Sequence, residues 1–458
     1  MTHTARSLRT PAAHRWHVRN MLAAFACAAA FTVTPEPAAA SAGIPTVWET
    51  ASDSATGQSE PVERLIDEAL AHNPELAASR AEGHAAQQRV APAGALEDPM
   101  MEIGILNAPL NSLNLRRDDM TMKMLGLSQK LPFPGKRSLR RSVATAQAEG
   151  ADFAVQENTN RIVRDVRMTF EDIVFNAEAR RILMRTEATL EQLVAITDSR
   201  HHVGQAAQSD VIEAQTELGR LRVTQLQLER EGLALRSQLR RLLGRSDSEP
   251  TIEVGAPTLR TATGTQVNLR TEALKSRPQL RALQAASERS AGALALARRE
   301  YYPDFDVRLS YGQRERTLDG VPRDNMVSLT VAVNLPIWRK TRLEPQVAEA
   351  RAMRDQADSM LQAQRLETTA ALDAQLAAVD QWRESAELYR TTLLPQAHVA
   401  VASALAAYRV GRVDFLTLRQ AQMREFETAT RYAEAISNHN KARAEIDLLV
   451  GRTWRAQQ

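Results

Sequence analysis

Cysteine and aromatic residues are scarce in this sequence of 458 residues. Cys27 is the single cysteine, and Phe, Trp and Tyr together make up 4% of the chain. A single cysteine cannot form a disulfide within the chain. In an oxidising compartment the protein would therefore have to fold without disulfides. Few aromatics beside abundant alanine suit long, closely packed helices better than a thick globular core.

Long apolar runs and an excess of one charge are also absent. After residue 40 no stretch of about 18 uncharged apolar residues occurs, so the sequence predicts no transmembrane helix. Residues 1–40 hold four arginines and one glutamate, which leaves 54 basic and 54 acidic residues in the rest of the chain. A nucleic-acid partner would require a basic face, so we expect none.

Catalytic motifs are missing too. No Ser/His/Asp triad, phosphate loop or paired-carboxylate site is visible, and glycine, histidine and cysteine are few. The sequence therefore predicts a protein that is not an enzyme and holds no cofactor. The adjacent His201 and His202 point in different directions on a helix and lack cysteines or carboxylates at ligand spacing, so we expect no metal site there.

The N-terminus has the pattern of an export signal. Four arginines precede an apolar run over residues 21–33, and the small residues Ala38 to Ala40 follow. The run is too short to span a bilayer. We predict a signal peptide over residues 1–40 and an irregular tether over residues 41–61, which are rich in Ser, Thr, Ala, Pro and Gly. Lipidation at Cys27 in place of cleavage after Ala40 stays open, as does a buried N-terminal helix.

The most informative feature is an internal duplication. Glu68-Ala69-Leu70 is repeated as Glu272-Ala273-Leu274, 204 residues later, and Gly244-Arg245 is repeated as Gly451-Arg452, 207 residues later. We predict a first repeat over residues 62–249, a linker over 250–265, a second repeat over 266–452 and a tail over 453–458. Repeated units suggest a device whose two halves occupy equivalent places around an axis.

Each repeat predicts the same order of elements. A helix over about 62–90 or 267–299 precedes two strands, and a very long helix over about 138–201 or 341–408 follows them. Pro395 lies inside the second long helix, where we expect a kink. Return helices over about 207–243 and 414–450 complete each repeat, and the first of them carries a heptad seam that runs from Val211 to Leu242.

The strands show alternation of period two. Residues 305–312 and 327–335 alternate apolar with polar side chains, and the first repeat shows the pattern more weakly around Ile103 and Leu125. Four strands with one apolar face cannot close a barrel, and an open edge in lipid costs several kcal/mol for each unpaired backbone group. This predicts an outer-membrane barrel built from several chains, with eight strands from two copies or twelve from three. A periplasmic structural coiled-coil protein is the alternative of another class.

At this point the sequence resembles the TolC family of outer-membrane efflux factors over nearly all of its length after residue 40. The motifs that carry the resemblance are Glu68-Ala69-Leu70, Asn73-Pro74-Glu75-Leu76, Asp98-Pro99, Leu127-Ser128-Gln129, Leu131-Pro132, Pro134-Gly135-Lys136 and Tyr408-Arg409-Val410-Gly411. The resemblance implies a mainly α fold with a small β part. It also implies a homotrimer with a 12-strand barrel in the lipid of the outer membrane and a long-helix α-barrel in the periplasm.

The resemblance also implies partners and cargo. Members of this family act as exit ducts together with a periplasmic adaptor protein and an inner-membrane transporter. Residues 98–100 and 120–136 are most similar to the heavy-metal branch, whose partners are resistance-nodulation-division transporters for copper, silver, cobalt, zinc or cadmium. Drug efflux and type I protein secretion are the alternatives.

The two helix-to-helix turns are the candidate adaptor-docking tips, and their residues are Val203, Gly204, Val410 and Gly411. The bland interpretation of both glycines is a left-handed C-cap. The resemblance further implies a gate at the tips, for which the candidates are Asp210, Tyr408, Arg412 and Asp414. Thr417 and Gln420 stand where some relatives carry acidic rings, so an acidic cation filter is not expected there.

Methionines gather near the first pair of strands, where thioethers suit Cu(I). Met120, Met122 and Met124 are weak metal candidates that the parity of the duplication places on the polar, lumen-facing side. A bulge in the first repeat would turn them toward lipid. Packing of the barrel wall is the interpretation that we favour.

Overall fold

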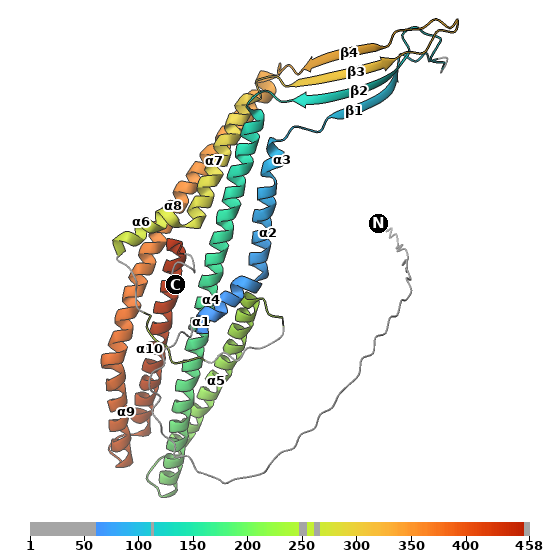
Figure 1. Cartoon of the computed structure of the whole chain (residues 1–458). Coiled ribbons are helices and arrows are strands. Elements are labelled where there is room, and N and C mark those ends of the chain that lie inside the picture. The colour runs from blue at the N-terminus through green and yellow to red at the C-terminus, as the bar shows by residue number, and fades with distance from the viewer. Residues whose placement is uncertain (1–60, 111–113, 247–253, 261–265, 453–458) are drawn as a thin grey trace, which may run out of the picture. The chain divides into compact units, whose positions relative to one another are not determined.

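A computed structural model describes residues 61–110, 114–246, 254–260 and 266–452 (Figure 1). The predicted signal peptide and tail, nearly all of the tether and much of the linker lie outside these residues. None of the helices in the described ranges combines the length and apolarity needed to cross a bilayer.

The described chain is mainly helical with one small sheet, as predicted. Its elements are α1 (Pro61–His72), α2 (Pro74–Gln88), α3 (Val90–Gly94), β1 (Met100–Leu106), β2 (Met122–Leu131), α4 (Lys136–His202), α5 (Gln208–Leu243), α6 (Gln266–Ser276), α7 (Pro278–Arg299), β3 (Phe305–Gln313), β4 (Met326–Val333), η1 (Arg339–Leu343), α8 (Glu344–Leu388), η2 (Tyr389–Leu393), α9 (Leu394–Arg409) and α10 (Phe415–Val450).

The opening helix of each repeat is broken, so the predicted continuous helices over 62–90 and 267–299 were wrong. The breaks fall at Asn73 and Arg277, whose ψ angles are 122° and 120°. Proline at the next position disfavours the helical conformation of the residue before it. Pro74 and Pro278 then start α2 and α7, because a missing N–H costs nothing at the first helical position.

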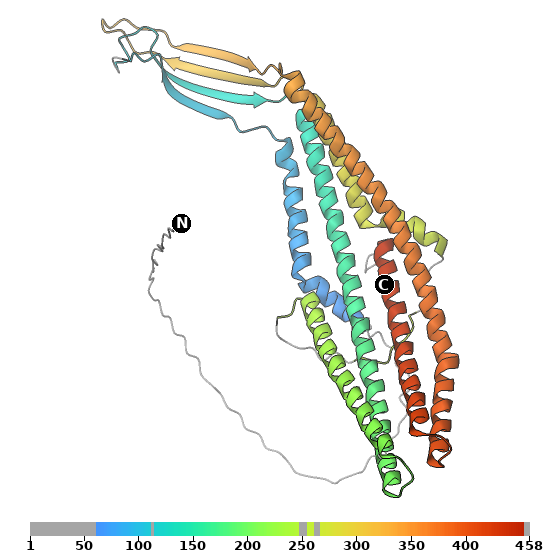
Figure 2. The ribbon, with the colours of Figure 1, turned by 180° about the vertical axis from the view of Figure 1, so that it is seen from behind.

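The four strands form one antiparallel sheet in the order β1-β2-β3-β4. Its register puts Glu102, Gly126 and Ser310 on one face and Ile103, Leu125 and Tyr311 on the other. The sheet therefore has one polar and one apolar face, and β1 and β4 are its two edges. Both views place it at one end of α4, with the turn between α4 and α5 at the other end (Figure 1, Figure 2).

The two long helical segments differ. α4 runs unbroken for 67 residues, about 100 Å at 1.5 Å per residue. Its counterpart begins with the π-helical segment η1 and is divided by a second one, η2, into α8 and α9. The expected irregularity at Pro395 takes the form of η2, because proline lacks the N–H that an α-helical turn requires and the wider turn gives its ring room.

The return helix α5 packs along α4 through the predicted heptad seam. Val211, Ala214, Leu221, Leu239 and Leu242 of the seam are buried. Near the sheet-facing end of α5, this seam joins a core formed with α1, α2 and the middle of α4. A second core lies at the tips, and a third lies between α6, α8 and the end of α10.

In each repeat an equivalent ion pair, here called the clasp, joins an arginine just after the return helix to the first helix. Arg245 forms an ion pair with Glu68, and Arg452 forms one with Glu272, with Nε 3.3 Å from Oε1. The adjoining Gly244 and Gly451 have φ of 69° and 74°. A Cβ atom on Gly451 would lie 2.7 Å from the Cα of Arg277, and one on Gly244 would strike the backbone oxygen of His72. Glycine is therefore required at both positions, because the backbone is left-handed and because backbone atoms of another segment lie too close for a Cβ.

Candidate functional site at the helical tips

Two short turns form the tips. In the first, Gln205 N donates to the carbonyl of Arg200 over 2.8 Å, and in the second, Arg412 N donates to that of Ala407 over 2.9 Å. Gly204 and Gly411 have φ of 72° and 73°, so both helices end in the left-handed cap that glycine adopts at little cost. Val203 and Val410 precede these glycines and are 66% and 68% exposed. Each tip therefore presents one apolar side chain to solvent.

Tyr408 joins the two hairpins just behind the tips. Its side chain is 3% exposed, and its hydroxyl lies 3.1 Å from Oγ1 of the fully buried Thr197 on α4. The guanidinium of Arg200 lies 4.8 Å from the centre of the Tyr408 ring and also donates to the Tyr408 carbonyl. Phe415 meets the same ring edge-on, with centroids 6.1 Å apart.

A tip cluster of apolar side chains surrounds this contact. Its buried members are Leu183, Leu190, Leu193, Ala214, Leu221, Tyr408, Phe415 and Leu418. On its border the buried carboxylate of Glu217 on α5 lies 3.2 Å from both Arg220 and Arg419. Because Arg419 belongs to α10, this ion pair is a further polar contact between the hairpins.

The predicted gate residues differ from one another in burial and in hydrogen bonding. Asp210 is half-buried at the start of α5, and Arg412 and Asp414 are exposed. Within the chain, Tyr408 bonds to Thr197 and no bond between Tyr408 and Asp210 is found in the described residues. Asp414 instead caps α10, since its Oδ1 accepts from Thr417 N over 2.9 Å and from Thr417 Oγ1 over 2.6 Å. These bonds hold the pKa of Asp414 below its usual range.

Sequence reasoning missed Thr197, Arg200 and Glu217. No periodic signal marks Thr197 or Arg200, because their partners lie more than 200 residues away along the chain. Glu217 lies beside the heptad seam, where a charged residue suggests solvent exposure. Its burial is explained by its ion pairs with Arg220 on the same helix and Arg419 on the facing hairpin, and the second of these has no local signal in the sequence.

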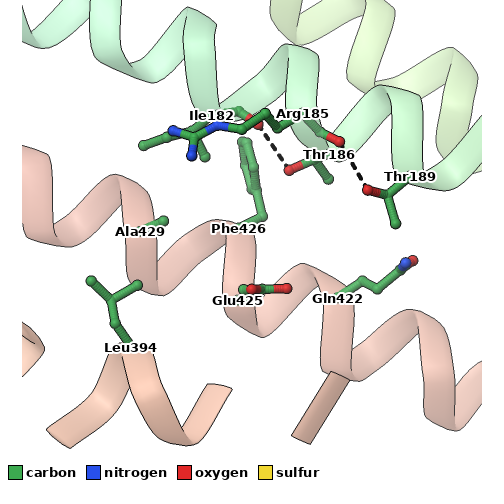
Figure 3. Close-up of a pocket in the computed structure, with 9 residues that line it drawn as sticks. All are labelled: Ile182, Arg185, Thr186, Thr189, Leu394, Gln422, Glu425, Phe426 and Ala429. Atoms are coloured by element: carbon green, nitrogen blue, oxygen red, sulfur yellow. Dashed lines mark hydrogen bonds between the residues drawn. The ribbon is translucent and has the colours of Figure 1, made fainter. Parts of the chain in front are cut away.

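A groove of about 250 Å³ separates the hairpins above the tip cluster (Figure 3). Ile182 and Arg185 of α4 lie on one side, and Glu425 and Phe426 of α10 lie on the other. The hydroxyls of Thr186 and Thr189 donate to carbonyls of their own helix over 3.0 Å. The hairpins are therefore joined at the tips, separate at this groove and meet again further up, where Lys441 of α10 lies 2.8 Å from Asp172 of α4.

The described residues contain no group of three or more His, Cys, Asp or Glu side chains that could hold a metal ion. His201 Nδ1 lies 3.0 Å from the carbonyl of Ala206, and His202 lies 3.6 Å from Asp198 one turn earlier, a neighbour that the spacing argument overlooked. Met122 and Met124 share the polar face of the sheet, opposite Leu106 and Gly104. Met120 lies in the turn before β2, outside the strand.

The family profile described as "Outer membrane efflux protein" matches residues 65–245 and 269–452. The chain belongs to this family. It is a TolC-like outer-membrane efflux channel that extends into the periplasm, and it is not an enzyme.

Named relatives add detail. The cobalt-zinc-cadmium resistance protein CzcC of Cupriavidus metallidurans is 27% identical over 179 residues, which are 39% of this chain and 41% of CzcC. The match thus spans less than half of that relative. The outer membrane protein VceC of Vibrio cholerae has a TM-score of 0.72 at 17% identity, covering 85% of this chain and 96% of VceC. CusC has a TM-score of 0.72 at 14% identity, covering 85% of this chain and 92% of CusC. Both structures share the fold.

Proposed function

We propose that this channel is the exit duct of a tripartite efflux system that exports heavy-metal cations such as copper, silver, cobalt, zinc or cadmium. Three copies form the duct, a resistance-nodulation-division transporter of the inner membrane supplies the energy, and a periplasmic adaptor protein connects the two. The chain itself conducts passively. The four-stranded sheet is the observation that supports a duct. The similarity to CzcC is the observation that supports heavy-metal cations as its cargo.

The sheet supports assembly from several copies. Ile103, Val327 and Leu329 are among the exposed side chains of its apolar face. Such a face is stable in lipid, but β1 and β4 then leave a row of unpaired backbone groups at each edge, and lipid offers them no partner. Pairing β1 of one copy with β4 of the next removes both edges. Three copies give twelve strands and a lumen wide enough for water, whereas eight strands fill with side chains.

The tips support adaptor docking. Val203 and Val410 are exposed beside glycines whose backbone is fixed by the caps, so the two turns form a rigid surface with two apolar points. Exposed apolar side chains on an ordered turn suit a protein partner. In this proposal Asp210, Arg412 and Asp414 lie at the rim of the closed pore, and Tyr408 holds the hairpins together behind them.

The cargo is tested by deleting the gene and measuring growth in copper, silver, zinc, cobalt and cadmium salts, with complementation by the wild-type channel. We expect sensitivity to one or more metals that the plasmid-borne channel reverses, while resistance to drugs and secretion of proteins stay unchanged. Unaltered metal resistance, with a loss of drug resistance or of a secreted protein, would contradict the metal cargo and favour the other duct functions.

A further inference from the structure

A row of alternating glycine and methionine crosses the sheet near one end. Met124, Gly312 and Met326 lie directly opposite one another on β2, β3 and β4, and Gly104 extends the row onto β1. Residues directly opposite on neighbouring strands share a face and are about 5 Å apart. Two methionines thus flank a glycine that has no side chain of its own.

A third methionine occupies the space above that glycine. A Cβ on Gly312 would clash with the Sδ atom of Met122, and the Cγ of Met122 is 3.3 Å from the position of that Cβ. Met122 is 9% exposed although it lies at the start of its strand. The side chains of Met124 and Met326 rise on either side of the same glycine. The three thioethers are therefore neighbours on one small area of the sheet.

This area belongs to the polar face. The same face carries Ser128, Arg308 and Thr330, as the strand register requires, whereas Met101 lies on the apolar face. Contact with lipid explains Met101, but it does not explain three methionines on the face that would line the lumen. Packing of a protein core does not explain them either, because this face has no covering layer in the described chain (Figure 1).

Thioether sulfur selects among metal ions. It is neutral and polarisable, so it prefers Cu(I) and the similarly soft Ag(I), whereas zinc and cobalt favour imidazole and oxygen ligands. Met122 begins β2 and Met326 begins β4, so the methionines lie at the end of the sheet remote from α4. An ion that moves along the lumen reaches them last. A transit site of this kind has to bind weakly enough to release its ion.

We infer that Met122, Met124 and Met326 form a binding site for a soft monovalent cation, Cu(I) or Ag(I), on the lumen wall near the outlet of the channel. Met326 was not among the sequence candidates, because only the pairing of β3 with β4 brings it to Gly312. The inference deepens the proposed function and rests on it for the cargo. It narrows that cargo toward soft monovalent ions, away from cobalt and zinc.

The experiment uses the purified channel in detergent and a chloride-free nitrate buffer, with Ag(I) as the probe in calorimetric titrations. The variant M122L/M124L/M326L removes the sulfurs while nearly conserving volume. The matched control is Met101→Leu on the opposite face. We expect wild type and Met101→Leu to bind about one Ag(I) per chain, the triple variant to bind it at least tenfold more weakly, and Zn(II) not to displace it. Equal Ag(I) affinity in all three proteins, or no binding to wild type, would overturn the site.

The assembled state of each variant is checked by its migration in detergent gels, so a misfolded triple variant is recognised before titration. If the triple variant fails to assemble, the single variant Met326→Leu replaces it. We expect this variant to bind Ag(I) at least threefold more weakly than wild type, and an unchanged affinity would contradict the site. The two proposals fail separately. Methionine-dependent Ag(I) binding beside unaltered metal resistance of the deletion strain would retain the site and reject the cargo. Metal sensitivity beside methionine-independent binding would retain the cargo and reject the site.

Discussion

The two halves of the chain share one plan but are packed unequally. α4 buries nineteen side chains against α2, α5, α7 and α10, whereas its counterparts η1, α8, η2 and α9 together bury six. Met353, Met360 and Leu366 of α8 are more than half exposed. The first long helix is thus covered by its own chain. The second keeps an apolar surface that neighbouring copies would cover in the proposed trimer.

The largest effect should come from the clasp glycines. In Gly244→Ala the left-handed backbone and the clash with the His72 carbonyl together should cost about 3 kcal/mol. In Gly204→Ala at the tip, nothing lies within 4 Å of the new Cβ, so the left-handed backbone alone should cost about 1 kcal/mol. Thermal unfolding of the two variants measures the difference. Equal losses of stability in the two variants would show that the close approach of the His72 carbonyl to Gly244 does not add to the cost.

A buried lysine links the halves and has an exposed counterpart. Lys136 is 1% exposed and lies 2.9 Å from Asp304 and 3.1 Å from Glu300, whereas Lys340 occupies the equivalent place in η1 and is exposed. Lys136→Met leaves two carboxylates without their cation and should cost about 3 kcal/mol of folding free energy. Lys340→Met should leave the fold of each chain intact and weaken trimer assembly.

The lysine comparison is measured by thermal unfolding together with the migration of the assembled channel in mild detergent. By the duplication, the neighbour's residues equivalent to Glu300 and Asp304 are Leu96 and Met100. The acidic Glu97 and Asp98 lie between them, so removing these charges should weaken assembly in the same way. If the assembled Lys340→Met channel is as stable as the wild-type channel, Lys340 does not contribute to the contact between copies.

A smaller effect is expected at the tips. Tyr408→Phe removes the hydroxyl that bonds to Thr197 and should cost about 1 kcal/mol of the contact between hairpins. Combined with Arg412→Ala, it should make the pore leakier and raise its conductance in planar bilayers. Thr197→Val, which removes the other partner, should have an effect similar to that of Tyr408→Phe alone. Conductance at the wild-type level in the double variant would count against the gate.

The smallest effect concerns the caps of the return helices. Asp414 caps α10, whereas Ala207 holds the equivalent place before α5 and provides no side-chain cap. Because the pKa of Asp414 is lowered in the folded state, its contribution is complete above the ordinary aspartate range and is lost as the pH falls through the lowered value. Asp414→Asn keeps the cap without the charge and should remove this pH dependence.

Amide exchange in the first turn of α10 measures the effect of Asp414, and exchange in α5 measures the gain expected from Ala207→Asp. If exchange at the start of α10 is the same in wild type and Asp414→Ala at neutral pH, the cap does not hold this turn.

The sequence predicted the elements better than it predicted their contacts. Period-two strands, two very long helices and the glycine turns follow from local patterns, so each could be placed within a few residues. The breaks at Asn73 and Arg277 were missed although Pro74 and Pro278 indicate them locally. The bonds of Tyr408 with Thr197 and of Arg419 with Glu217 could not be predicted, because they join segments about 200 residues apart that the fold alone brings together. The position of Met326 beside Gly312 likewise depends on strand register.

The central claim is that separate copies close the sheet into one barrel, and the mass of the native particle tests it most directly. Native mass spectrometry of the channel, extracted from outer membranes and released from detergent in the gas phase, should give three chains per particle. A chain that remains a monomer and stays dispersed in buffer without detergent would contradict the account, because the apolar face and both edges of its sheet would then be stable in water.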